Sequence, residues 1–85
     1  ELRKGRLCVE YGYYDQAIST FNKYLDVYTN DKAETSEVLY ILAEAYEKNG
    51  DNTKSRESLN KCVEISPEGR FGKNAQEKLE VIDSL

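Results

Sequence analysis

The strongest structural signal in this chain lies in residues 39–67, which read LYILAEAYEKNGDNTKSRESLNKCVEISP. A small residue is followed seven positions later by a glycine, five positions after that by another small residue, and after four more by a large apolar one. The same spacing occurs 38 residues earlier in the chain. The two sets are Ala43, Gly50, Ser55 and Leu59, and Gly5, Gly12, Ala17 and Phe21. A period of this length predicts an array of similar units that bury their apolar faces against one another.

Apolar residues that recur every three or four positions predict an all-α fold of five amphipathic helices. We expect these helices at residues 2–11, 14–28, 32–48, 53–65 and 70–84. The third helix is apolar around most of its circumference, so it should lie at the centre. Gly12 and Gly50 should end the first and third helices, and Asp31 should cap the third. Sustained alternation of apolar and polar residues, the signature of strands, is absent from the sequence.

Composition excludes several classes of function. Twelve basic and sixteen acidic residues give a net charge of −4, which argues against a nucleic-acid or anionic membrane surface. No run of 18 apolar residues exists that would predict a transmembrane helix. The chain has no histidine and no Cys-x-x-Cys pair, so we predict neither a metal nor a cofactor. Cys8 and Cys62 fall on apolar faces, where two buried free thiols are expected, with a disulfide as the alternative.

The second unit resembles a tetratricopeptide repeat. Its motif positions hold Leu39, Leu42, Ala43, Tyr46, Ser55, Leu59 and Pro67. The first unit is similar from Gly5 to Tyr28, but it departs from the pattern with Lys4 at an apolar position and Cys8 at the tyrosine position. The resemblance implies antiparallel helix-turn-helix repeats at residues 1–30 and 31–67, closed by a helix at 68–85. The chain lacks an initiator methionine and is expected to be a piece of a longer protein.

In tetratricopeptide arrays the first helix of each pair lines a concave groove, so the resemblance implies a protein-binding module. The groove positions are Leu2, Arg6, Val9, Glu37, Tyr40, Glu44, Glu47 and Lys78. An aromatic residue among carboxylates favours a peptide with basic and apolar residues. For Tyr40 the alternative is ordinary packing against the last helix. The spacing of 38 residues is also similar to the longer-loop repeats of bacterial envelope proteins, which leaves the compartment open between periplasm or envelope and cytoplasm.

We predict no enzymatic activity. General acid–base catalysis needs two groups whose environments push their pKa values apart, and glutamates spaced along one exposed helix face give no such difference. Two other interpretations stay open. The chain could be a structural spacer that associates with itself through Leu2, Leu7 and Val9 at its first end. It could also be an accessory domain of an enzyme whose catalytic part lies outside these residues.

Overall fold

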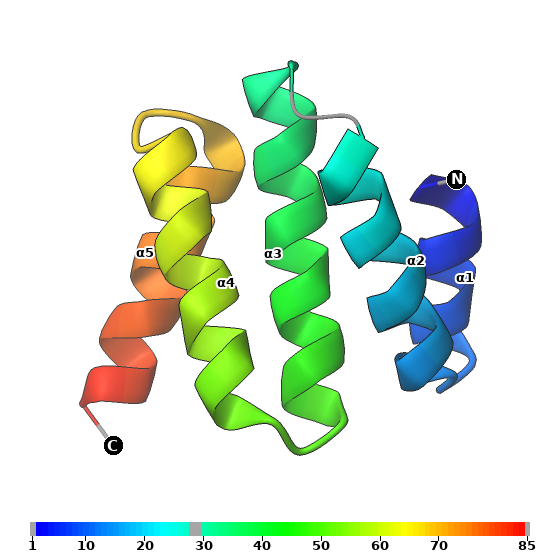
Figure 1. Ribbon diagram of the computed structural model, residues 1–85. Coiled ribbons are helices and arrows are strands. Elements are labelled where there is room, and N and C mark those ends of the chain that lie inside the picture. Colours follow the sequence, from blue (N-terminus) through cyan, green and yellow to red (C-terminus); the bar gives the residue numbers. More distant parts are fainter. Residues whose placement is uncertain (1, 28–29, 85) are drawn as a thin grey trace.

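The computed structural model describes residues 2–27 and 30–84, and for Leu2 it describes the backbone alone (Figure 1). Its five helices are α1 (Leu2–Glu10), α2 (Tyr14–Val27), α3 (Lys32–Lys48), α4 (Asn52–Ile65) and α5 (Arg70–Asp83). This part of the chain contains no strand, so the all-α prediction is confirmed. The expected helix ends agree within one residue, and the predicted end of the second helix at Tyr28 lies outside the described residues.

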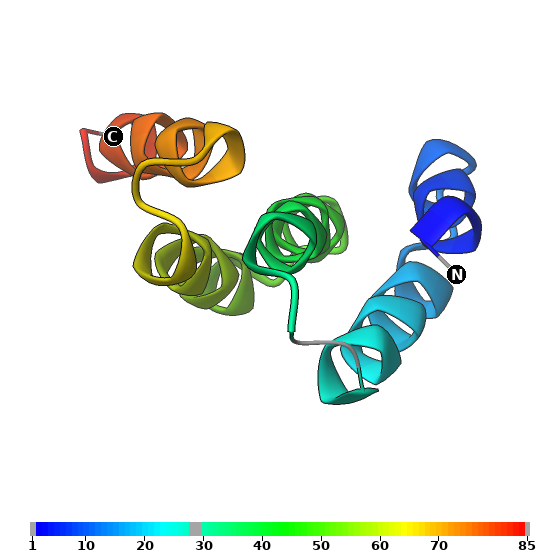
Figure 2. The same ribbon diagram turned by 90° about the horizontal axis from the view of Figure 1, so that it is seen from above.

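Consecutive helices run in opposite directions and form two layers. Figure 2 shows α1, α3 and α5 on one side of the molecule and α2 and α4 on the other. The molecule measures 30 × 29 × 17 Å, and 17 Å is the thickness of two helices in contact. The division into repeats at residues 1–30 and 31–67, with a closing helix at 68–85, stays a prediction.

Two glycines and two aspartates set the sharp turns. Gly12 and Gly50 have φ angles of 83° and 88°, a region that residues with a Cβ rarely adopt, and they follow α1 and α3 as predicted. The Asp31 side chain accepts a hydrogen bond from the Glu34 backbone N–H at 3.1 Å. Asp51 does the same for the N–H of Lys54 at 3.0 Å, which explains why α4 begins at Asn52, one residue earlier than expected.

The core consists of two clusters that share α3. The first joins α1, α2 and α3, and the second joins α3, α4 and α5. Their buried members are Val9, Ala17, Phe21, Tyr24, Val38, Leu42 and Ala45 in the first, and Leu39, Ala43, Leu59, Cys62, Ala75 and Leu79 in the second. Because α3 contributes to both clusters, its predicted central place is confirmed.

Small residues let the helices of the second unit approach closely. The buried Ser55 hydroxyl donates a hydrogen bond to the Ala43 carbonyl at 2.8 Å, across the α3–α4 contact. Gly72 makes a second close approach, because a Cβ there would overlap the Ser66 carbonyl. Ala43 and Ser55, two of the expected small residues, therefore allow the backbones of α3 and α4 to approach each other closely.

Both cysteines are free thiols, as predicted, and they differ in exposure. Cys62 is fully buried, and its thiol lies 3.2 Å from the Ser36 carbonyl oxygen and 3.3 Å from that of Phe71. It therefore links α4 to α3 and α5. Burial raises the pKa of the Cys62 thiol to about 11, because a thiolate would lose its hydration there. Cys8 is only half-buried, which corrects the expectation of two fully buried thiols.

Candidate functional site

The candidate surface centres on one stripe of α3. Glu37, Tyr40, Glu44 and Glu47 follow one another at intervals of three and four residues, so they share a face of the helix. Glu47 is exposed and the other three are half-buried. The remaining faces of α3 pack into the two core clusters. The stripe is therefore the side of the central helix that lies between α1 and α5.

One ion pair connects the stripe to α1. The guanidinium of Arg6 pairs with the carboxylate of Glu37. Both side chains retain access to water, with 49% and 23% of their surfaces exposed. An ion pair in such surroundings contributes about 0–1 kcal/mol, so another charged group can replace either partner at little cost.

Of the other two groove positions predicted on α1, Val9 is buried in the core and Leu2 is described only by its backbone. Val9 does not face the groove: it is 8% exposed and belongs to the first core cluster. Val9 lies four residues after Gly5, on the side of α1 that packs against Phe21. Because Val9 is buried, it is also not part of an exposed surface through which the chain could associate with itself. The Leu2 side chain lies outside what the structure describes.

The α5 side of the stripe is more extensively connected. The Lys78 Nζ lies 3.4 Å from the Glu47 Oε1 and 5.5 Å from the centre of the Tyr40 ring. The Tyr40 ring also packs against Phe71, with 5.7 Å between ring centres and an angle of 50° between ring planes. Tyr40 thus packs against the last helix, as the alternative interpretation held, while part of its surface stays accessible.

Glu44 is the stripe's least engaged carboxylate. Its ion pair is with Lys48, one turn further along the same helix, at 3.4 Å. Such a pair within one exposed helix contributes about 0.3–0.5 kcal/mol. Among the described residues, no ion pair joins Glu44 to α1 or α5. Among the three glutamates of the stripe, Glu44 is therefore the one whose ion pair does not involve a neighbouring helix.

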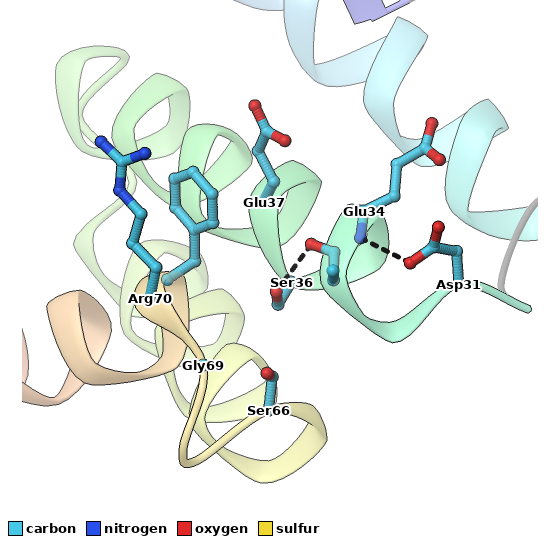
Figure 3. Close-up of a pocket in the computed structure, with 9 residues that line it drawn as sticks. Asp31, Glu34, Ser36, Glu37, Ser66, Gly69 and Arg70 are labelled. Carbon is cyan, nitrogen blue, oxygen red and sulfur yellow. Dashed lines mark hydrogen bonds between the residues drawn. The ribbon is translucent and has the colours of Figure 1, made fainter.

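A cavity of about 420 Å³ continues the surface toward the first turns of α3 and α5 (Figure 3). Carboxylates of Asp31, Glu34 and Glu37 line its α3 side, and Arg70 lies on its α5 side. Phe71 also lines the cavity, and the guanidinium carbon of Arg70 is 5.5 Å from the centre of its ring. The cavity thus combines an aromatic surface with charges of opposite sign.

Sequence reasoning missed Arg70 and Phe71 as surface residues. Phe71 is half-buried and packs against the second core cluster, and its exposed part lines the cavity. Helical periodicity places residues around one helix, but it does not say which neighbour a helix end lies against. Only the packing of α5 on α3 brings these two side chains beside Glu37.

The described residues hold no group of three or more histidine, cysteine or acidic side chains arranged to bind a metal ion. None of the described helices combines the length and the apolar character needed to span a bilayer. The arrangement offers aromatic surface and exchangeable ion pairs, which are features of a recognition surface.

Comparison with known proteins identifies the second unit. Residues 36–68 match the family model described as Tetratricopeptide repeat. The matched segment spans most of α3, all of α4 and the start of the following loop. A search of curated proteins and a search of solved structures found no match. Repeats of this family are non-enzymatic modules that generally mediate protein–protein interactions.

Proposed function

We propose that this chain, a member of the tetratricopeptide repeat family through its second unit, binds a peptide or helix of a partner protein on the face formed by α1, α3 and α5. Tyr40 is the centre of this surface, and Arg6, Glu37, Glu44, Glu47 and Lys78 surround it. Leu2 stays a predicted member of this surface.

A single observation carries the proposal. The central helix α3 is packed into core on most of its sides, yet it keeps one stripe with an accessible aromatic ring between two ion pairs to its neighbours. Aromatic side chains in partly dry surroundings are the usual anchors of protein interfaces. Exposed ion pairs are weak, so a partner's charges can replace them without a large loss of stability.

The charges favour a partner segment with basic and apolar residues. Three glutamates of the stripe face two cations from neighbouring helices, Arg6 and Lys78, which leaves Glu44 with a partner on its own helix. A lysine or arginine of the bound segment would pair with Glu44. An apolar side chain next to it would cover Tyr40 and the edge of Phe71.

The test is a peptide-display selection on the purified domain, followed by affinity measurements on two double variants. The groove variant is Tyr40→Ala with Glu44→Lys. The matched control is Tyr11→Ala with Glu10→Lys, at exposed positions near the end of α1; Tyr11 is 71% exposed. We expect selected basic, apolar peptides to lose at least about tenfold in affinity for the groove variant only, as for loss of one interface anchor.

Circular dichroism would confirm that both variants stay folded. Peptides that bind the two variants equally well would move the binding site off the α3 stripe. Peptides that lose affinity for both variants alike would show attraction by overall charge rather than recognition at Tyr40.

Self-association of the chain is a second candidate function, favoured by apolar side chains exposed at both ends of the helical row. Leu7 on α1 is 43% exposed and Val81 on α5 is 61% exposed. A head-to-tail contact between two copies would cover both. Sedimentation equilibrium distinguishes the candidates: a monomer at concentrations approaching millimolar would remove self-association, and Leu7→Glu should abolish any dimer observed.

A further inference from the structure

We propose a second binding site on the opposite layer of the molecule, in a cleft between α2 and α4 that accepts one large apolar side chain of an acidic peptide segment. This site does not rest on the function proposed for the α3 stripe, because the two surfaces lie on different layers and share no residue. The repeat resemblance implies no docking surface on this layer.

The helices α2 and α4 both pack on α3, and no contact joins α2 to α4 within the described residues. Figure 2 shows α2 and α4 in the same layer. The cleft between them is lined by residues of α2, α3 and α4. It encloses about 150 Å³, and Leu39 and Leu42 of α3 and Leu25 of α2 form its apolar lining. A cavity of about 150 Å³ is large enough for a benzene-sized group. The space therefore matches one leucine or phenylalanine side chain.

Polar contacts hold one wall of this cleft in place. The Asn22 Nδ2 donates a hydrogen bond to the Tyr46 hydroxyl at 3.2 Å and so connects α2 to α3. The Lys54 Nζ lies 5.9 Å from the centre of the Tyr46 ring, on the α4 side. Because these contacts exist before any ligand binds, the cleft requires little reorganisation to receive a side chain.

The charge on the rim indicates an acidic occupant. Lys54 and Lys61 both line the cleft and are seven residues apart on α4, which places them about 10.5 Å apart along the helix axis. No carboxylate of the described residues forms an ion pair with Lys61. In a chain of net charge −4, two lysines beside an apolar space are a local exception that attracts carboxylates.

Glu57 refines the expected sequence of the occupant. It lies on the rim between the two lysines, so it disfavours a carboxylate at the centre of the bound segment. It can instead accept a hydrogen bond from a backbone N–H of the peptide. An extended peptide rises about 3.3 Å per residue and alternates its side chains between two faces. Acidic residues four positions apart, with the apolar residue midway between them, would therefore point to one face, and their spacing of about 13 Å lies within reach of the long side chains of Lys54 and Lys61.

The experiment uses fluorescein-labelled synthetic peptides in which leucine, phenylalanine or isoleucine stands midway between two glutamates four positions apart. Fluorescence anisotropy gives affinities, and amide chemical shifts in NMR spectra map the site. We expect saturable binding that weakens with salt and shifts the amides of Leu25, Ser58 and Lys61. Replacing the central residue by alanine, or both glutamates by lysine, should abolish binding.

Two charge-reversal variants separate recognition from general attraction. Lys54→Glu with Lys61→Glu should weaken binding by at least about tenfold, since two attractions become repulsions. The control Lys4→Glu with Lys73→Glu changes the net charge equally at exposed positions outside the cleft, and it should bind as the unmodified chain does. The groove variant at Tyr40 and Glu44 should also bind normally.

Several outcomes would overturn the inference. The first is the absence of binding by every peptide of the set at millimolar concentration. The second is equal weakening by both charge-reversal pairs, which would show non-specific attraction. The third is a set of amide shifts on α1 and α5 instead of α2 and α4, which would assign acidic peptides to the stripe. Shifts that appear only as the chain dimerises would show that a second copy occupies the cleft.

Discussion

The two helical units of this chain share one pattern of small and large residues, yet the same contact is filled differently in each. In the first unit Gly5 lies against Phe21, close enough that a Cβ at Gly5 would be 2.6 Å from the Phe21 ring. In the second unit the corresponding residues are Ala43 and Leu59, both buried in one cluster. Where the small residue is smaller, as Gly5 is, the large residue on the other helix is larger, as Phe21 is. The combined volume of the two side chains, rather than the identity of either residue, therefore fills the space between the helices.

The units also differ in how much of the molecule encloses them. In the second unit, α3 contacts helices on both sides, and α4 contacts α5. In the first unit, α1 is nine residues long and buries Gly5 and Val9, with Cys8 half-buried, while Arg3, Lys4 and Leu7 are exposed. Helices this short draw their stability from tertiary packing, so the first unit should open before the second.

The largest effects should come from removing the large member of each pair. Phe21→Ala should lower the free energy of unfolding by about 3–5 kcal/mol, and Leu59→Ala by about 2–5 kcal/mol, because both side chains are fully buried. Native-state hydrogen exchange should show Phe21→Ala exposing mainly amides of α1 and α2. Equal loss of protection in α4 and α5 would contradict the independence of the first unit. Val81→Ala, at an exposed site, is the control.

Enlarging the small member of the second pair should destabilise the protein by about 1–3 kcal/mol. Ala43 is 1% exposed, and its carbonyl accepts the Ser55 hydroxyl, so the added atoms of Ala43→Leu have no free space. Denaturant unfolding followed by circular dichroism measures the change. A denaturation midpoint equal to that of the unmodified chain would refute close packing of α3 on α4.

The corresponding change in the first unit should be reversible by a second substitution. Gly5→Ala should cost about 1–3 kcal/mol because the new Cβ meets the Phe21 ring. Adding Phe21→Leu recreates the pair found in the second unit and should restore part of that loss. A double-mutant cycle measures the coupling. Strictly additive effects would show that the two residues do not compensate each other.

The smallest effect, absent at neutral pH, should come from Cys62. Its pKa is raised to about 11 in the folded state from an ordinary value of 9.0. Above about pH 9 the unfolded chain therefore binds fewer protons at this site than the folded chain, so stability should fall as pH rises from 9 to 11. This part of the pH dependence should disappear in Cys62→Ala.

At neutral pH, iodoacetamide should modify the half-buried Cys8 thiol faster than the buried Cys62 thiol. Equal modification rates would contradict the buried position of Cys62.

Local sequence signals were sufficient for the helices and turns. Positive φ angles at Gly12 and Gly50 and the cap at Asp31 follow from chemistry within a few residues, so these predictions were confirmed. The stripe of α3 could also be predicted from the sequence, because residues three and four positions apart share a helix face. Val9 was predicted wrongly because its helix face was inferred from the repeat, whereas the packing of Gly5 on Phe21 turns Val9 toward the core.

Sequence periodicity was enough to predict an all-helical chain with a central third helix, because the apolar spacing constrains each helix locally. The fold alone brought residues from distant segments together: Arg6 to Glu37, Lys78 and Phe71 to Tyr40, and Lys54 to Tyr46. The position of one helix on another depends on side-chain volumes summed over a whole interface, and such sums have no local signature in a sequence.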